Sequence, residues 1–431
     1  MSKQEKHNET IAVIGLGFVG LPLAMLLISK GIRVIGVDLD KKKVEALQKG
    51  NSYISDINDQ AVQDGIGTGF FRPVSDYGLI GEADAVIICV PTPLNDDAGP
   101  DLNYVKGAAQ SIRAHLKKGQ LVVLESSTYP GTTRDIVKPI LEKSGLVCGK
   151  DFYLAYSPER VDPGNQFPIE VVPKVVGGAT EACLEKVHQL YSGIYEEVVP
   201  VTSPETAELT KLLENTYRFI NISFINEFAM MCDRLGVNVW EVIEAASTKP
   251  YGFAAFYPGP GIGGHCIPVD PLYLQFVMKQ SGLSSDFIEL SEATNERIVR
   301  YIAERSLQLA GKDKATDARI LIYGVTYKRN IADVRESKSL DIIEKLIGMG
   351  AEVSYHDPHV PDLDLSGKKL ASMPIDSKML KEYDCVVVLT DHDALPKELL
   401  LNYANVIFDT RGVLREAAGK AKVIQLGNGR P

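Results

Sequence analysis

A glycine fingerprint near the N-terminus constrains the fold of this chain more than any other feature. Gly15, Gly17 and Gly20 follow a short apolar run and open a helical pattern, and a second apolar run comes after that helix. We expect a strand, a helix and a strand over residues 11–15, 22–30 and 33–38. A GxGxxG sequence in this context is typical of the first βαβ unit of a dinucleotide-binding fold.

The three glycines have separate tasks in such a turn. The first permits the tight turn, the second lets the backbone approach a pyrophosphate, and the third allows the helix to pack closely on the strand. The helix N-terminus attracts the phosphate charge. Asp38, at the end of the second strand, would accept hydrogen bonds from ribose hydroxyls and repel a 2′-phosphate. This favours NAD over NADP, although the lysines at positions 41–43 weaken that preference.

The rest of the chain divides by its periodicity. Further strand patterns occur at residues 85–90, 121–125 and 152–156, and the middle of the chain is helical, with one long helix over 205–235. After a polar linker at 311–317, a second α/β pattern begins with strands at 320–323, 352–356, 385–389 and 406–408. We expect two Rossmann-like doubly wound parallel-sheet domains, residues 1–202 and 313–431, joined by a central helical domain, residues 203–312. The first turn of the second unit, YGVTYK, lacks the fingerprint, so we assign it no dinucleotide.

Composition excludes several classes of function. The net charge of −10 argues against a nucleic-acid-binding protein, which needs a basic surface. The apolar runs are too short to span a membrane, and the polar tail at residues 1–10, expected to be disordered, lacks the apolar stretch of a secretory signal. A cytoplasmic protein is therefore expected. The six cysteines show neither CxxC pairs nor metal-ligand spacing, so we predict no metal site, and all but Cys266 fit the pattern of small core residues.

Cys266 lies in the most unusual segment of the chain, YPGPGIGGHCIPVD at residues 257–270. A cysteine after a glycine-rich loop, with a helix about to begin, is in a setting that favours the thiolate. An ordinary cysteine beside a turn is more often a small buried residue, but the surrounding pattern favours a nucleophile here. Asp270 would lie one helical turn away if the segment is helical, within reach of a water or a proton.

Lys211 and Asn215 share one face of the long predicted helix. A lysine on an amphipathic helix normally points into solvent. In this largely apolar stretch, the pair could instead supply a cation and an amide donor to a developing oxyanion.

These segments together resemble the UDP-glucose and GDP-mannose dehydrogenase family over nearly the whole chain. GLGFVGLP, VPTP, SSTYPGTT, SPER, KLLEN, GPGIGGHCIPVDP and DVRESKS stand in the expected order. The resemblance implies two successive hydride transfers to two NAD molecules, a covalent intermediate on Cys266 and a C-terminal unit that binds UDP. Trapping the aldehyde as a thiohemiacetal keeps it from water, and a second oxidation gives a thioester that water hydrolyses.

The resemblance also implies the site residues. Lys211 and Asn215 stabilise oxyanions, Asp270 and Glu159 assist the water, and Thr128 positions it. The expected catalytic residues are Cys266, Lys211, Asn215, Asp270, Glu159 and Thr128. The expected cofactor-binding residues are Gly15, Gly17, Phe18, Val19, Gly20, Asp38, Lys43, Pro91, Thr92, Thr128 and Arg335. The expected substrate-binding residues are Glu159, Arg160, Lys211, Asn215, Tyr257, Gly259, Gly261, Gly263, Lys328 and Arg411. As isolated surface cations, Lys328, Arg335 and Arg411 would more often be solvated.

The sugar is predicted from finer resemblances. The GGHCIPVDP form, with Val269 before Asp270 and His265 before Cys266, resembles the branch that oxidises UDP-N-acetylhexosamines. The YPGPG and SPERVDPGN segments look most like those of UDP-N-acetylglucosamine 6-dehydrogenases, with UDP-N-acetylmannosamine enzymes as close rivals. UDP-N-acetylgalactosamine and UDP-glucose remain alternatives. The family resemblance further implies a homodimer or larger assembly through the long helix.

Two other classes of function stay open. One is a catalytically inactive nucleotide-sugar-binding protein, which the joint presence of Cys266, Lys211, Asn215 and Asp270 disfavours. The other is a one-step hydroxyacid dehydrogenase, which the third domain and the cysteine loop disfavour. The yield of NADH per sugar distinguishes the three functions.

Overall fold

The computed structural model describes residues 9–54, 57–95, 99–160, 167–365, 367–415 and 418–429. The predicted disordered tail lies mostly outside this range, as does the VDPGN part of the SPERVDPGN segment. The chain forms two compact units, residues 1–214 with 272–283, and residues 215–271 with 284–431. The division falls within two helices, so the three-domain division at residues 202 and 312 stays a prediction.

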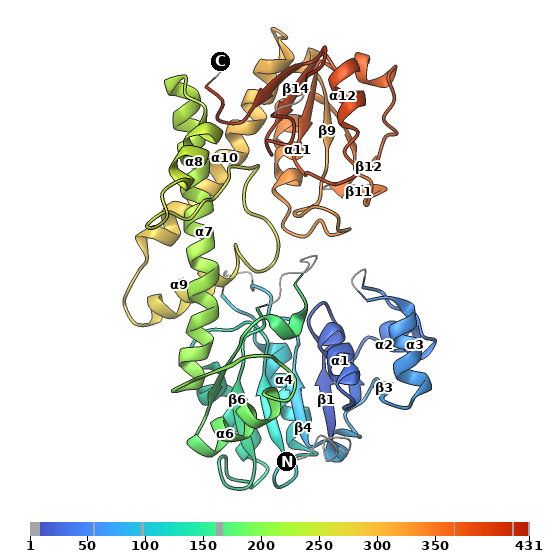
Figure 1. Cartoon of the computed structure of the whole chain (residues 1–431), viewed down its shortest axis with the longest axis vertical. Helices are drawn as coiled ribbons and strands as arrows, with labels where there is room; N and C mark the ends of the chain where they lie inside the picture. Colours follow the sequence, from blue (N-terminus) through green and yellow to red (C-terminus); the bar gives the residue numbers. More distant parts are fainter. Residues whose placement is uncertain are drawn as a thin grey trace. The chain divides into compact units, whose positions relative to one another are not determined.

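The first unit is built on an eight-stranded sheet of order β3-β2-β1-β4-β5-β6-β7-β8 (Figure 1). Its strands are β1 (Thr10–Ile14), β2 (Arg33–Val37), β3 (Phe71–Val74), β4 (Ala85–Ile88), β5 (Leu121–Leu124), β6 (Tyr153–Tyr156), β7 (Lys174–Gly178) and β8 (Val198–Val201). All pairs are parallel except β6 with β7. The strand order reverses between β1 and β4, the position at which such sheets bind ligands.

Helices cover both faces of this sheet. They are α1 (Gly20–Ser29), α2 (Lys41–Gln48), α3 (Asp59–Gly67), α4 (Asn103–Arg113), α5 (Lys138–Glu142) and α6 (Glu181–Tyr191), with a π-helical turn at Thr132–Val137. The central strands are buried on both faces, which is why they read as continuous apolar runs. Alternate residues of β1 and β4 enter two separate cores, one containing Ile11 and Ile87 and the other Ala12 and Val86.

Long helices connect the two sheets along the chain. They are α7 (Pro204–Leu235), α8 (Val239–Ser247), α9 (Asp270–Gln280) and α10 (Asp286–Ala310). Residues 202–318, all of which are described, contain no strand, as the loss of strand patterning predicted. No helix among the described residues is long and apolar enough to cross a membrane.

The second unit contains a parallel five-stranded sheet of order β10-β9-β13-β14-β15. Its elements are β9 (Arg319–Tyr323), α11 (Lys338–Gly348), β10 (Glu352–His356), β13 (Cys385–Val388), α12 (Lys397–Tyr403), β14 (Val406–Asp409) and β15 (Lys422–Gln425), with a hairpin of β11 (Asp362–Leu365) and β12 (Lys368–Ala371). Two Rossmann-like parallel sheets joined by helices are therefore confirmed as the fold. The missed strands, such as β3 and β15, are short and only partly apolar.

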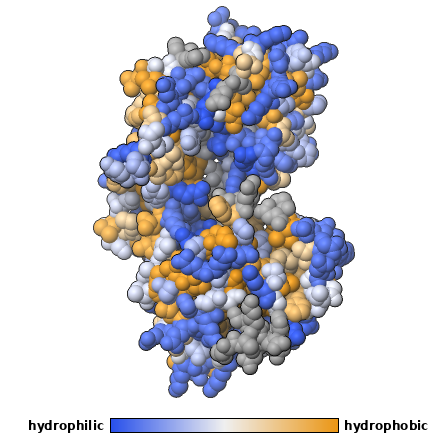
Figure 2. Space-filling model, viewed as in Figure 1, coloured by the Kyte–Doolittle hydropathy of each residue, from blue (hydrophilic) through white to orange (hydrophobic). Residues whose placement is uncertain are grey.

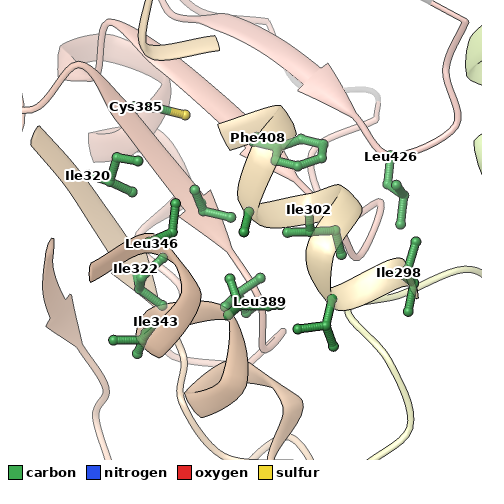
Figure 3. Close-up of a cluster of buried hydrophobic side chains, with 14 of the residues drawn as sticks. Ile298, Ile302, Ile320, Ile322, Ile343, Leu346, Cys385, Leu389, Phe408 and Leu426 are labelled. Atoms are coloured by element: carbon green, nitrogen blue, oxygen red, sulfur yellow. The ribbon is translucent and has the colours of Figure 1, made fainter. Parts of the chain in front are cut away.

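Helix α10 completes the core of the second unit. Ile298 and Ile302 share a core with Ile322 and Phe408 of the sheet and with Leu389, which follows β13 (Figure 3). On the face drawn in Figure 2, hydrophobic residues reach the surface of both units among hydrophilic ones. Each unit has its own hydrophobic core. Binding and catalytic residues are therefore expected on the loops at the ends of the strands.

Candidate active site

The glycine loop between β1 and α1 has the geometry that the fingerprint predicts. Gly15 has a φ of +89°, and a Cβ there would lie 2.6 Å from the carbonyl oxygen of Cys89. A Cβ on Gly20 would lie 1.8 Å from the carbonyl oxygen of Gly15, so only glycine lets the helix approach the strand. A Cβ on Gly17 would meet no atom within 4 Å. Open space beside the second glycine fits a pyrophosphate at this loop.

The start of α1 is open to a ligand. Val19 precedes the helix, and no side chain among the described residues caps the helix N-terminus. Phe18 is largely exposed beside it. A helix N-terminus without a side-chain cap is the kind of site that binds anions through its backbone N–H groups.

Asp38 lies at the end of β2, where a ribose is expected. Its Oδ2 accepts a hydrogen bond of 2.9 Å from the N–H of Leu16, and the ammonium of Lys43 lies 3.7 Å from the same oxygen. The hydroxyl of Tyr53 donates to the carbonyl of Leu16 at 2.5 Å. These contacts fix the carboxylate against the glycine loop while its side chain stays partly exposed.

Two later strands end beside the glycine loop, because β1, β4 and β5 are parallel. Pro91 and Thr92 follow β4, and the Thr92 hydroxyl donates to the carbonyl of Ser127 at 2.8 Å. The hydroxyl of Tyr273 donates to the Thr92 carbonyl. Thr128 is fully buried and its hydroxyl contacts that of Thr132 at 2.6 Å.

Glu159 and Arg160 follow β6 at the same edge of the sheet. Oε1 of Glu159 accepts from the N–H of Arg160 at 2.7 Å, and Oε2 lies 3.2 Å from the ammonium of Lys174. Arg160 is itself paired with Glu214, with an Nη2–Oε1 distance of 2.6 Å. Its guanidinium is thus held by a carboxylate of α7.

The second unit carries the cysteine loop. Cys266 is partly exposed, whereas the other five cysteines are buried. Its Sγ lies 3.2 Å from Nδ1 of His265. The N–H of Asp270 donates to the carbonyl of Cys266 at 2.9 Å, so the two residues are one helical turn apart, as predicted, and α9 begins at Asp270.

Asp270 also contacts the long helix α7. The side-chain amide of Asn215 donates to its Oδ2 at 2.6 Å, and both side chains are at least 96% buried. Lys211 lies one turn earlier on the same helix and is partly exposed. The structure therefore brings Asn215, Asp270 and the Cys266 segment together.

Arg335 lies near the thiol. Its guanidinium pairs with Asp333, with an Nη2–Oδ2 distance of 2.7 Å, and this hydrogen bond raises the pKa of Arg335. The charge of Cys266 contributes to the same shift. A permanent cation in the vicinity favours the thiolate of Cys266.

A pocket of about 200 Å³ joins the cysteine loop to the second sheet. Gly261 and Gly263 line it together with Lys328 and Arg411, as the substrate prediction requires. Its full lining is Pro260, Gly261, Gly263, Thr326, Tyr327, Lys328, Arg329, Ser337, Lys338, Ser339, Leu389, Thr390, Asp391 and Arg411. Its cations and hydroxyls, with loop backbone, suit a phosphorylated polar ligand.

The glycines of this loop make room for their neighbours. A Cβ on Gly259 would lie 2.7 Å from Nη1 of Arg411, and one on Gly263 would lie 2.5 Å from the carbonyl oxygen of Glu336. Tyr257 stands outside the pocket lining and stacks on Trp240, with ring centroids 6.0 Å apart.

The turn after β9 in the second sheet has the same backbone-to-aspartate hydrogen bond as the turn after β1, but its aspartate has a different second partner. The N–H of Val325 donates to Asp357 at 2.7 Å, as that of Leu16 does to Asp38. Here, however, His392 lies 3.1 Å from the same carboxylate, and both side chains are fully buried. Asp357 is therefore engaged inside the protein, and the absence of a dinucleotide at this turn stays a prediction.

Sequence reasoning missed two residues of these clusters. His265 was noted only as a marker of the subfamily, and Lys174 was not singled out. A lysine at the start of a buried strand is a signal that could have identified Lys174, since lysine is rarely buried without a partner. No group of three His, Cys, Asp or Glu side chains in the described ranges could hold a metal ion.

Comparison with known proteins identifies the family of the chain. Three family models of the UDP-glucose/GDP-mannose dehydrogenase family match the chain. The NAD binding domain matches residues 9–195, the central domain 205–297 and the UDP binding domain 321–416.

Individual relatives match over almost their full length. A UDP-N-acetyl-D-mannosamine dehydrogenase from Methanococcus maripaludis is 37% identical, with 99% of each chain covered. An NDP-N-acetyl-D-galactosaminuronic acid dehydrogenase from Ralstonia nicotianae is 35% identical over 94% of this chain and 96% of its own. The solved structure of a UDP-D-ManNAc dehydrogenase from Pyrococcus horikoshii matches with a TM-score of 0.87 and 31% identity, over 97% of this chain and 99% of that one.

Proposed function

Because this chain belongs to the UDP-glucose/GDP-mannose dehydrogenase family and is an NAD-dependent UDP-sugar dehydrogenase, we propose that it oxidises C6 of a UDP-N-acetylhexosamine to a carboxylate. The observation that carries the proposal is the cluster of Cys266, Asn215 and Asp270 beside a polar pocket. The cluster holds a nucleophile, an amide donor and a carboxylate, the groups that covalent oxidation of an aldehyde needs.

The first unit would hold NAD through its own residues. Gly17 leaves room for the pyrophosphate, the uncapped start of α1 faces it, and Asp38 would bind the ribose hydroxyls. When bound, NAD accepts a hydride in each of the two oxidations. Phe18, Val19, Lys43, Pro91, Thr92, Thr128 and Arg335 are the further cofactor contacts that we propose.

Cys266 is the proposed nucleophile. Its sulfur adds to the C6 aldehyde to give a thiohemiacetal, and oxidation of that adduct leaves a thioester. Water then attacks the thioester carbon, the carbon–sulfur bond breaks, and the acid leaves with Cys266 as the thiolate. His265, at 3.2 Å from Sγ, is placed to exchange a proton with the thiol.

The oxygen that becomes negative in these steps needs donors. We propose that Asn215 and Lys211 supply an amide and a cation from one face of α7. Asp270 accepts from the Asn215 amide, so it fixes which way that amide points. Asp270 and Glu159 assist the hydrolytic water, and Thr128 helps to position it.

The pocket of the second unit would hold the UDP part. Lys328 and Arg411 line it and would pair with the diphosphate, while the backbone of Gly259, Gly261 and Gly263 follows the ligand closely. Tyr257, Glu159 and Arg160 are the further substrate contacts that we propose.

The identity of the sugar is the finer part of the proposal. Relatives named UDP-N-acetyl-D-mannosamine dehydrogenase support UDP-N-acetylmannosamine as one candidate substrate. Relatives named NDP-N-acetyl-D-galactosaminuronic acid dehydrogenase support UDP-N-acetylgalactosamine. UDP-N-acetylglucosamine, predicted from the YPGPG and SPERVDPGN segments, stays a second candidate. These sugars differ at C2 or C4, away from the C6 chemistry of the cysteine loop.

The decisive experiment is an NADH assay against UDP-GlcNAc, UDP-ManNAc, UDP-GalNAc and UDP-glucose side by side. We expect two NADH per molecule of one N-acetylated sugar, with an acid as product. A yield of one NADH would indicate a one-step dehydrogenase, and binding without NADH formation would indicate an inactive sugar-binding protein. Preferred turnover of UDP-glucose would overturn the N-acetylhexosamine assignment.

We also propose a homodimer through α7. Six exposed apolar side chains lie at intervals of four and seven along this helix, so they share one face: Leu209, Leu213, Tyr217, Phe224, Met231 and Leu235. An exposed apolar stripe of this length is typical of an interface. Light scattering of the wild type should give the mass of a dimer or a larger assembly, and Phe224→Asp should lower that mass. A wild-type mass equal to that of one chain would contradict the proposal. Cytoplasmic location and a role in polysaccharide synthesis also remain proposals.

A further inference from the structure

A buried lysine lies behind the proposed water-activating carboxylate. Lys174 opens β7 and is only 3% exposed. Its ammonium is 2.9 Å from Oε2 of Glu125, which follows β5, and 3.2 Å from Oε2 of Glu159, which follows β6. One cation therefore bridges the ends of two neighbouring strands at the edge where the sheet binds its ligands.

Helix α6 and the residues after it close the cluster from the other side. The Tyr191 hydroxyl donates to Oε1 of Glu125. The Lys174 ammonium lies over the rings of Tyr191 and Tyr195, at 5.5 and 5.1 Å from their centroids. Cys89, after β4, is a further buried titratable group whose charge couples to Glu125, Lys174 and Glu159. The lysine is thus enclosed by carboxylates and aromatic rings.

The ionisation of Lys174 depends on the carboxylates around it. Burial opposes the charge of Lys174, but Glu125 and Glu159 raise its pKa well above the ordinary value. Burial raises the pKa of Glu125. A buried cation with two anions is poor evidence of a stability device, because apolar residues of similar size often stabilise a core as well. The functional consequence of the cluster is its hold on the Glu159 carboxylate.

Glu159 is the member of the cluster that remains partly exposed. Its Oε2 is held by Lys174 and its Oε1 by the N–H of Arg160, at 2.7 Å. Each oxygen therefore has a donor, and the plane of the carboxylate is set. Glu125, in contrast, is fully enclosed by Lys174 and Tyr191.

We propose that Lys174 is a positioning residue for Glu159: its ammonium keeps the Glu159 carboxylate ionised and oriented for the hydrolysis of the thioester on Cys266, while Glu125 and Tyr191 hold the ammonium in place. In that step water adds to the thioester carbon, the carbon–sulfur bond breaks, and a proton of the water passes to Glu159. The inference rests on the proposed function, in which Glu159 assists this hydrolysis. Lys174 acts only through Glu159.

The test measures hydrolysis and oxidation separately in single turnovers. The substrate is the UDP-N-acetylhexosamine that gives NADH in the assay above, and the enzyme is in excess over it. NADH absorbance reports the oxidations, and intact-protein mass reports the acyl adduct on Cys266. Lys174→Met/Glu125→Gln removes one cation and one anion, so the buried charge stays balanced. Glu125→Gln alone is its matched control, and Lys118→Met, which breaks a surface pair with Asp151, controls for loss of a lysine.

The double variant should release acid at least 10-fold more slowly, accumulate the adduct, and form NADH in the burst within about threefold of wild type. Relative to Glu125→Gln, which has lost the same anion, the double variant lacks only the cation beside Glu159, so the acidic limb of its hydrolysis profile should lie at higher pH by about one unit or more. Lys118→Met should match wild type. A folded double variant that hydrolyses at the wild-type rate, with its acidic limb no higher than that of Glu125→Gln, would overturn the proposal.

The single variant gives an independent test, should the double variant fail to fold. In Glu125→Gln, Glu159 no longer shares Lys174 with a second carboxylate, so its acidic limb should move to lower pH with hydrolysis retained. If the acidic limb of the Glu125→Gln profile stays in place or moves to higher pH, the proposed role of Lys174 is contradicted. Glu159→Gln is the reference: if it accumulates no adduct while the double variant does, the proposed role of Glu159 fails. If neither wild type nor any of these variants forms an adduct, the covalent mechanism fails.

Discussion

Asn215 donates its side-chain amide to Oδ2 of Asp270 at 2.6 Å, although 55 residues separate them in the sequence. Asp270 is also tied through its N–H to the carbonyl of Cys266. The contact joins the long helix to the cysteine loop. It gives Asp270 a second task beside the water, which is to orient an oxyanion donor.

Asp270→Asn should therefore damage catalysis more than binding. The substituted amide can present a donor to Asn215, which disturbs the orientation of both side chains, and it can no longer take a proton. We expect kcat to fall by about 100-fold or more with KM changed by less than threefold. Steady-state kinetics with the preferred sugar measure both. A rise in KM at constant kcat would assign Asp270 to binding alone.

Native alkylation should find one reactive thiol. Cys266 is partly exposed near Arg335, whereas the other five cysteines are buried. Brief treatment with iodoacetamide should add one carbamidomethyl group at Cys266 and abolish activity, as peptide mass mapping would show. The UDP-sugar should slow the reaction. Earlier labelling of any other cysteine would remove the case for Cys266 as the accessible nucleophile.

Two glycine substitutions should fail for different reasons. In Gly17→Ala the new methyl group meets no protein atom within 4 Å, so the protein should fold normally while NAD binds at least 10-fold more weakly. In Gly20→Ala the methyl group would overlap the carbonyl oxygen of Gly15 and should lower the melting temperature. Calorimetry and NAD titration distinguish the two. Normal NAD affinity in Gly17→Ala would contradict the proposed pyrophosphate position.

A buried carboxyl on α7 should give stability a specific pH dependence. Glu208 accepts from the N–H of Gly131 and from the N–H and hydroxyl of Thr133, yet burial raises its pKa from 4.5 to about 7. The folded state then binds the proton more tightly than the unfolded state does. The contribution of this group to the free energy of unfolding is greatest below pH 4.5 and is lost as the pH rises through about 7.

Glu208→Gln removes this titration. Between pH 5 and 8, wild type should lose about 2 kcal/mol more unfolding free energy than the variant. Urea unfolding at the two pH values measures the difference. Glu205→Gln, in the first turn of the same helix, is the control and should follow wild type. Parallel pH curves for Glu208→Gln and wild type would show that Glu208 does not titrate in this range.

The sequence by itself determined the fold class and the cofactor loop. Both depend on local rules, because apolar periodicity sets the strands and a glycine is required wherever a Cβ would strike backbone, as at Gly15 and Gly20. The one-turn spacing of Cys266 and Asp270 was predictable for the same reason. Strand β7 was not predicted, and its antiparallel pairing with β6 could not have been, since pairing direction depends on where the chain returns and not on local composition.

Only the tertiary structure decided which polar side chains act together. Asn215 with Asp270, Lys174 with Glu125 and Glu159, and His392 with Asp357 are all pairs from separate elements. The sequence shows that Asp38 and Asp357 each follow the second strand of an α/β unit. It does not show that His392 contacts Asp357. Burial makes these pairings obligatory, because a charged group removed from water must find its partner inside the fold.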